Sequence, residues 1–249
     1  MASAPPPVSL TFLGTGNFLT PGRYWNSFVL DHAVLVEPSP TVLPHLRKLG
    51  IGVEGIETVV ISHFHPDHTF GWPFLLLEAL FTRAGQTLHI VGPPGVERFL
   101  ADMNKLGGIP DVQAAAYQRL DLKFVEVDGS WQTAGSLRFQ AIEVVHVPHL
   151  RCFGYLFERE GRNIGYSGDT TSCPGLSEIA AASDVLVLEC DGQHAHPGLA
   201  VTHMSEDSVR ALRAAHPGVR FILTHLGAGV DASAIQDVYV PEDFERLTV

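Results

Sequence analysis

Residues 58–68 read TVVISHFHPDH, and this stretch decides how the chain folds and what it binds. Its first half, Thr58 to Ser62, is β-branched and apolar, which is typical of a buried strand. Its second half, His63 to His68, places three imidazoles and a carboxylate within six residues, where that strand ends. Imidazole nitrogen and carboxylate oxygen suit zinc, and also manganese or iron. We therefore expect a metal site at the end of a buried strand.

The spacing within this motif favours two metal ions over one. Residues two apart in an extended segment point the same way, so His63 and His65 can converge on one ion. Asp67 and His68 lie where the chain turns after the extended segment, and they can bind a second ion. The alternative is an exposed histidine-rich loop, but such loops seldom combine this density of histidine with a strand exit.

Two ions need more ligands than six residues can supply, so distant side chains must take part. Three candidates each follow a predicted strand: His146, Asp169 in the turn Ser167-Gly168-Asp169-Thr170, and His225 in Thr224-His225-Leu226. We expect one ion on His63, His65 and His146, the other on Asp67, His68 and His225, and Asp169 bridging the two.

Hydrophobic patterning predicts an α/β fold. Strands are expected over residues 8–13, 26–30, 33–37, 58–62, 89–91, 122–127, 136–145, 153–158, 163–166, 185–189 and 221–224. Helices are expected over residues 40–50, 73–83, 95–107, 176–182 and 205–215. Strands run first and then alternate with helices, and each half repeats this order without a linker between them. We predict one domain over residues 1–249, a four-layer αββα sandwich.

Composition limits the function classes. A chain of 249 residues with 45% hydrophobic and 17% charged residues is typical of a globular enzyme. The formal net charge of −11 disfavours unaided binding to nucleic acid or to an anionic membrane. Two bound cations would offset part of that charge locally, so a small anionic substrate remains compatible. The unusual count is 13 histidines, because imidazole is the commonest metal ligand.

Several features point to a cytoplasmic protein without a membrane anchor. Residues 1–7 lack the basic and apolar regions of a signal peptide, and no run of about 18 apolar residues is long enough to span a bilayer. The three cysteines are an odd count without C-x-x-C spacing, which argues against a disulfide framework.

The H-x-H-x-D-H segment, His146, the Ser-Gly-Asp-Thr turn and the final Thr-His together resemble the metallo-β-lactamase-fold hydrolase superfamily. The match spans the chain from Leu13-Gly14-Thr15-Gly16 to His225. The surroundings are most similar to the branch of ribonuclease Z and related phosphodiesterases, on the evidence of residues 68–76 (HTFGWPFLL) and of Phe153-Gly154-Tyr155. This resemblance implies a two-metal site at the edge of an αββα sandwich, and, since relatives are often dimers, a homodimer.

Two departures from ribonuclease Z bear on the substrate. Where that enzyme has a His-Glu-Ala-Thr sequence, this chain reads Leu188-Glu189-Cys190-Asp191, without the histidine. The long basic arm that grips transfer RNA also has no counterpart, because the six lysines and arginines between Phe81 and His146 are scattered. Nucleic acid is therefore not the expected partner.

The identity of one ligand stays open at this point. Gly154 lies eight residues after His146 and five after His149, and the spacing usual in the branch falls between these values. His146 is favoured because it ends a strand, which leaves His149 near the pocket.

Two residues are expected to take part directly in catalysis. Asp67 can both ligate a metal and orient the attacking hydroxide, which two cations would generate from a shared water. His203 matches the position of the catalytic histidine of ribonuclease Z relatives, so it is the candidate general acid or substrate contact. The alternative for His203 is a structural residue beside the helix N-cap Ser205. His194 and His196 could bind metal, but a loop beside the pocket is the better interpretation.

The function predicted from these observations is hydrolysis of small or cyclic phosphodiesters by two divalent cations, with zinc as the expected ion. Three alternatives use the same scaffold: a lactone, ester or thioester hydrolase, a ribonuclease Z-type endonuclease, and a redox enzyme with two irons.

Overall fold

The strands form two seven-stranded sheets that pack face to face, in the part of the chain that the computed structural model describes, residues 7–192 and 202–249. The first sheet has the order β14 (Arg246–Thr248), β1 (Ser9–Gly14), β2 (Ser27–Leu30), β3 (Val34–Val36), β4 (Thr58–Val60), β5 (Thr87–Gly92) and β6 (Asp121–Glu126). The second has the order β13 (Val238–Tyr239), β12 (Arg220–Thr224), β11 (Val185–Glu189), β10 (Arg162–Tyr166), β9 (Cys152–Arg159), β8 (Leu137–Val144) and β7 (Trp131–Ala134).

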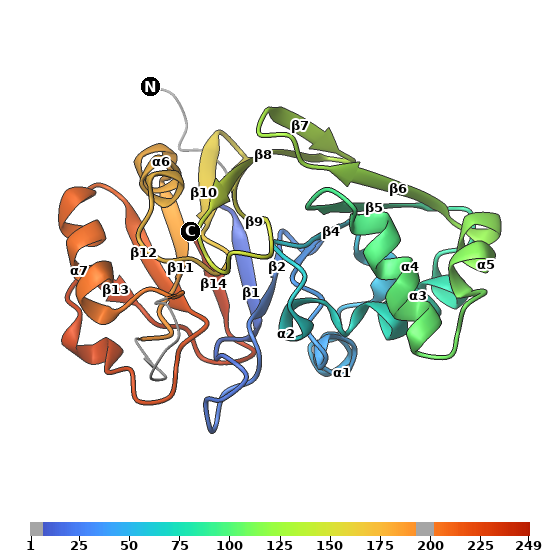
Figure 1. The fold of residues 1–249 in the computed structure, drawn as a ribbon, viewed down its shortest axis with the longest axis horizontal. Helices are drawn as coiled ribbons and strands as arrows, with labels where there is room; N and C mark the ends of the chain where they lie inside the picture. Colours follow the sequence, from blue (N-terminus) through green and yellow to red (C-terminus); the bar gives the residue numbers. More distant parts are fainter. Residues whose placement is uncertain (1–6, 193–201) are drawn as a thin grey trace.

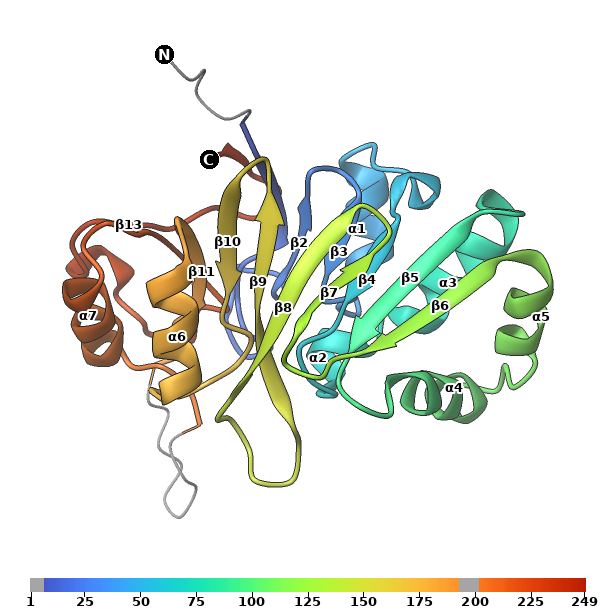
Figure 2. The ribbon, with the colours of Figure 1, turned by 90° about the horizontal axis from the view of Figure 1, so that it is seen from above.

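Helices cover the outer face of each sheet (Figures 1 and 2). The first sheet carries α1 (Val42–Lys48), α3 (Trp72–Thr82), α4 (Val96–Leu106) and α5 (Val112–Arg119), and the second carries α6 (Pro174–Ala182) and α7 (Glu206–Ala215). The short helix α2 (Pro66–Thr69) and two 3-10 turns, η1 (Val53–Gly55) and η2 (Ala232–Ala234), complete the described elements. The predicted αββα sandwich is confirmed. None of the described helices is long and apolar enough to cross a membrane.

The continuous apolar sequence of the central strands follows from their place between two packed layers. In β4, Val60 faces the opposite sheet while Val59 packs beneath the helices. In β11, Val187 likewise faces the other sheet and Leu188 packs against α6 and α7. Because successive side chains point to opposite faces of a strand, a strand covered on both faces needs apolar residues at every position.

The structure adds elements that hydrophobic patterning did not predict. α5 has the sequence VQAAAYQR, whose apolar residues do not form one clear stripe. β7, β13 and β14 are edge strands of two to four residues, too short to carry a readable alternation. These elements lie away from the strand ends that carry the histidines.

Candidate metal centre

The HxHxDH motif enters the site through a short helix that begins directly after a strand. His63 is fully buried beyond β4, and His65 is the N-cap of α2 with extended backbone geometry. Pro66 occupies the first helical position, where its fixed φ favours helix initiation and its missing N–H costs nothing. The single turn of helix that follows carries Asp67 and His68 on the same side as the strand exit.

The three distant residues also stand at strand ends. His146 lies two residues after β8, Asp169 three residues after β10, and His225 directly after β12 with a φ of +48°. Gly168 precedes Asp169 with a φ of +57°, and a Cβ there would lie 2.6 Å from the carbonyl oxygen of Phe153. A glycine is therefore required for the turn that presents Asp169.

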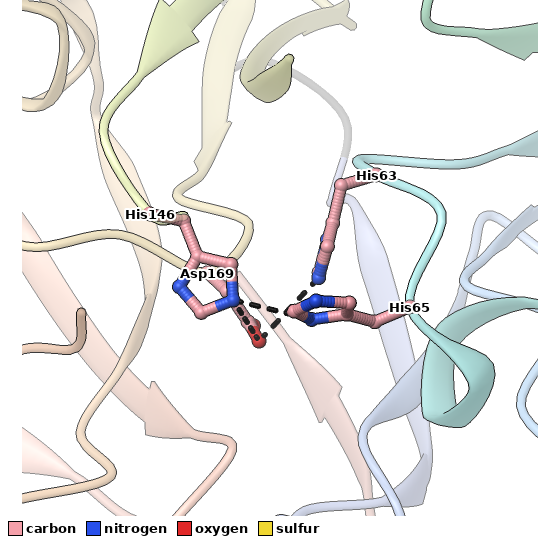
Figure 3. Close-up of side chains that lie close together, drawn as sticks. All are labelled: His63, His65, His146 and Asp169. Carbon is pink, nitrogen blue, oxygen red and sulfur yellow. Dashed lines mark hydrogen bonds and ion pairs between the residues drawn. The ribbon is translucent and has the colours of Figure 1, made fainter. Parts of the chain in front are cut away.

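One carboxylate oxygen lies at the centre of the cluster. Oδ2 of Asp169 is 3.3 Å from Nε2 of His68 and 3.4 Å from Nε2 of His225. On the other side it is 3.8 Å from Nε2 of His63 and 4.0 Å from Nε2 of His146 (Figure 3). Asp169 thus lies between two sets of histidines.

The structure brings all seven predicted ligands together, in groups that overlap at Asp169 and that also place His203 beside Asp169 and His225. The candidate ligand atoms of His63, His65, His146 and Asp169 all lie within 4.8 Å of one another, and so do those of Asp67, His68 and His225. In the first set, Nδ1 of His65 is 3.2 Å from Nε2 of His146. In the second, Oδ2 of Asp67 is 3.4 Å from Nε2 of His68 and 3.6 Å from Nε2 of His225.

The residues fit divalent cations because several buried polar atoms point into the cluster without a hydrogen-bond partner among the described residues. These atoms include Nε2 of His63, of His68 and of His225, and Oδ1 of Asp169. A buried polar group without a partner costs about 1–3 kcal/mol, so each such atom favours a ligand. Nitrogen and carboxylate donors converging at this density match the coordination preferences of zinc and neighbouring first-row ions.

Without a cation, the cluster balances its charge with protons. Burial is the largest single influence on His68 and His225 and lowers their pKa, but the carboxylates around them, Asp169 and Asp67 for both and Glu37 for His68, together outweigh it and raise the pKa of both above the ordinary value. Burial, with a smaller contribution from His68, drives the pKa of His63 well down, and burial together with His146 lowers the pKa of His65 to about 4. The carboxylates therefore favour positive charge on these two imidazoles, at the place where cations would otherwise stand.

Hydrogen bonds behind the rings fix the direction in which the imidazoles face. Nδ1 of His146 donates to the carbonyl oxygen of Thr202 at 2.8 Å, and Nδ1 of His63 lies 2.9 Å from Oγ of Ser62. The carbonyl oxygen can only accept, so it selects the tautomer of His146 that leaves Nε2 free to bind a metal, and the Ser62 hydroxyl can accept from Nδ1 of His63 in the same way.

Glu37 is a buried carboxylate behind His68 that the sequence analysis did not single out. It lies at the end of β3 with a φ of +58°, and its Oε2 is 3.6 Å from Nδ1 of His68. Its Oε1 accepts hydrogen bonds from the backbone N–H of Ser62 and the hydroxyl of Tyr166, both at 3.1 Å. The sequence could have indicated Glu37 by its position, because it is a charged residue directly after an apolar strand that runs parallel to β4.

His203 lies at the rim of the cluster and is held by two acidic residues. Its Nδ1 is 2.9 Å from Oε1 of Glu189 and its Nε2 is 3.3 Å from Oδ2 of Asp191. Burial lowers the pKa of His203, but the charge and hydrogen bond of Glu189, together with the charges of Asp169 and Asp191, outweigh it and raise the pKa to about 10. The ring centroid lies 4.7 Å from that of His146. Glu189 and Asp191, which stand where the expected histidine is missing, are two further residues that sequence reasoning did not assign.

The structure accommodates both interpretations of His203, as a residue that faces the cluster and as a neighbour of the helix N-cap Ser205. Ser205 caps α7 by accepting the N–H of Ser208 at 3.1 Å, while His203 faces the cluster. His149 is exposed and makes none of the cluster contacts, so His146 is the histidine brought to the other ligands. His194 and His196 lie outside the described residues.

Comparisons with known proteins agree with this geometry. The family model described as "Beta-lactamase superfamily domain" matches residues 32–226. A ribonuclease Z of Pyrobaculum arsenaticum is 27% identical over 293 aligned positions, covering 98% of this chain and 99% of the relative. Those positions outnumber the 249 residues here, so the relative carries segments that this chain lacks. The relative is named a ribonuclease, and this name weighs against the prediction that nucleic acid is not a partner.

Solved structures show the same fold. The metallo-β-lactamase-fold protein YhfI of Bacillus subtilis superposes with a TM-score of 0.78 at 18% identity, covering 98% of this chain and 100% of that one. A diphosphatase of the PhnP family superposes with a TM-score of 0.76 at 19% identity, covering 96% and 97%. The chain therefore belongs to the β-lactamase superfamily, as a metallo-β-lactamase-fold hydrolase of the branch that contains ribonuclease Z and related phosphodiesterases.

Proposed function

We propose that this protein is a phosphodiesterase with two divalent cations, acting on small or cyclic phosphodiesters. The observation that carries the proposal is the central position of Asp169, whose Oδ2 lies within 3.3–4.0 Å of histidines from both ligand sets. A single carboxylate oxygen between two sets of donors is the arrangement expected of a bridging ligand. In this proposal His63, His65 and His146 hold one zinc ion, and Asp67, His68 and His225 hold the other.

When bound, two such cations act as Lewis acids, acidify a water molecule and stabilise negative charge that develops on the phosphoryl oxygens. Asp67 is partly exposed beside the centre, where its free lone pairs can orient the attacking water. In the metal-free centre the pKa of His203 is raised to about 10 beside Glu189, so this residue can carry the proton of a general acid. As the bond from phosphorus to the leaving oxygen breaks, His203 donates its proton to that oxygen, and the neutral imidazole stays hydrogen-bonded to Glu189.

The experiment uses purified protein, its metal content and a panel of esters. Turnover of bis(p-nitrophenyl) phosphate, lost on chelation and restored by zinc at two ions per chain, supports the proposal. Fully metallated protein that leaves a phosphodiester panel intact while cleaving homoserine lactones or glutathione thioesters contradicts it.

A ribonuclease Z-type endonuclease is the second candidate, favoured by the full-length match to a ribonuclease Z. Two observations weigh against it: the net charge of −11, and the scattered basic residues between α3 and His146. Cleavage of a transfer-RNA precursor at a rate above that for small diesters would favour this candidate instead.

We also propose a cytoplasmic location, supported by three free cysteines, and a homodimer, by analogy with the branch. Burial raises the pKa of Cys152 to about 11 and that of Cys190 to about 12, so these thiols are unreactive. Fractionation and sedimentation measurements test the two expectations.

A further inference from the structure

An aromatic pocket opens directly beside the candidate metal centre. It has a volume of about 720 Å³, and His65 and Asp67 form one of its walls. The rest of the described lining comprises Phe18, Trp25, Pro40, Pro66, Phe70 and Phe74. Four of these side chains are aromatic, and none of the described lining residues is a lysine or an arginine.

The exposure of this lining is unusual for side chains of this size. Phe18 and Phe74 are each 60% exposed and Phe70 is 49% exposed, although they stand close together around one cavity. Large apolar side chains gathered at an open pocket mark a binding site more often than isolated exposed residues do.

The backbone segments that carry the two walls of the pocket are held by hydrogen bonds or belong to helices. On one side, the N–H of Asn17 donates to the carbonyl oxygen of Leu226, directly beside His225, at 3.0 Å. In the same loop, the N–H of Asn26 donates to the carbonyl oxygen of Gly16 at 2.9 Å, which holds Trp25 in place. On the other side, Phe70 ends α2 and Phe74 lies in the first turn of α3.

We propose that this pocket binds a planar aromatic group of the substrate, attached to the phosphodiester that the metal centre cleaves. The position of the phosphorus rests on the proposed function, whereas the position of the ring rests only on the residues that line the pocket. A neutral ring can stack on Phe70, Phe74 or Trp25 while its phosphoryl group reaches the cations that His65 and Asp67 would hold. A second phosphate would meet Asp67 without a compensating cation in the described lining, so the occupant is aromatic rather than polyanionic.

The test is a binding measurement with a phosphodiester mimic that cannot be hydrolysed. p-Nitrobenzyl(methyl)phosphinate carries one negative charge and two P–C bonds, and its nitrophenyl ring quenches tryptophan fluorescence. Dimethylphosphinate is the matched compound without a ring. We expect zinc-loaded protein to bind the aryl compound at least about tenfold more tightly, the ratio that about 1.4 kcal/mol of ring contact gives. Equal affinity for the two compounds overturns the proposal.

Two variants of α3 locate the ring. Phe74→Ser removes a pocket wall and is expected to abolish most of the preference for the aryl compound. Phe81→Ser removes an aromatic of the same helix that is 77% exposed and lies outside the pocket, so it should leave the preference intact. Retention of the full preference in Phe74→Ser contradicts the assignment, and a circular dichroism spectrum confirms that both variants fold.

Competition separates two sources of the ring. A cyclic nucleotide that displaces the aryl phosphinate identifies a nucleobase as the natural ring, whereas displacement only by aryl phosphates identifies a simpler aryl ester. The inference and the proposed function fail separately. Aryl binding without turnover of any diester contradicts the phosphodiesterase and leaves the pocket assignment standing, while turnover without an aryl preference does the reverse.

Discussion

Oδ2 of Asp169 lies 3.4 Å from Nε2 of His225, at the point where the loop after β10 meets the loop after β12. Both strands run parallel to β11, which lies between them, so their carboxyl ends open at the same edge of the sheet. The same oxygen approaches His63 from the opposite sheet at 3.8 Å. One carboxylate therefore joins the two halves of the sandwich.

Replacing this carboxylate should remove both function and one metal. Asp169→Asn keeps the shape of the side chain and removes its charge, so the two ligand sets lose the anion between them. We expect at most one zinc ion per chain and a fall in phosphodiester turnover of at least about 100-fold. This fall is larger than the loss typical of a residue that only hydrogen-bonds to a metal ligand. Elemental analysis alongside kinetics checks both, and a variant that still holds two ions refutes the bridging role.

Metal affinity should fall as the pH is lowered. The pKa of His68 and of His225 is raised in the metal-free cluster, so protons compete with an ion for their nitrogens more strongly than at an ordinary imidazole. Each released proton changes the apparent affinity about tenfold per pH unit. Calorimetry in buffers of different ionisation enthalpy counts the protons released. Zinc binding that releases none would show that these histidines are not ligands.

Glu37→Gln tests the carboxylate behind His68. An amide nitrogen facing Nδ1 of His68 would favour a proton on Nε2, the nitrogen that points into the cluster. We expect zinc affinity about 10–100-fold weaker, the cost typical of an outer partner of a metal ligand. Glu143→Gln, which alters only a surface pair with Arg151, is the control. Thermal unfolding of both metal-free variants separates this effect from a loss of folding.

His203→Gln should slow turnover without changing the metal content. A proton donor matters most when the leaving oxygen is basic, so the loss is expected to be about 10²–10⁴-fold for alkyl diesters and much smaller for p-nitrophenyl esters. Glu189→Gln should also slow turnover, and more for alkyl diesters than for p-nitrophenyl esters, because Glu189 hydrogen-bonds to the imidazolium of His203. An equal loss for both leaving groups would point to a structural role for His203.

His146 and His149 should behave oppositely on truncation. His146 lies 3.2 Å from His65, whereas His149 is exposed. His146→Ala is therefore expected to reduce zinc content and activity together, and His149→Ala to change neither. The reverse pattern would transfer the ligand assignment to His149.

Much of the site could be predicted because strand ends are readable from sequence. An apolar, β-branched run followed by histidine or aspartate marks a side chain at a sheet edge, as at His63, Asp169 and His225. Glu37 and Glu189 end strands in the same way, but a lone glutamate gives no metal signature, and only the packed structure shows what each one faces. The aromatic pocket combines the loop containing Phe18 with the start of α3, and no local pattern brings these segments together.

Fold prediction shows the same limit. Central strands such as β4 and β11 are continuous apolar runs because both faces are covered. Edge elements such as β7 and β14 owe their existence to pairing with a neighbour that is already in place, so their own residues carry little information.

The most direct test of the account is anomalous X-ray diffraction from crystals of the zinc-loaded protein, recorded on both sides of the zinc absorption edge. We predict two anomalous peaks roughly 3.5–4 Å apart, the separation usual in two-metal hydrolytic sites, with Oδ2 of Asp169 between them. A single peak, or peaks away from His63, Asp169 and His225, would contradict the two-metal centre on which the proposed chemistry depends.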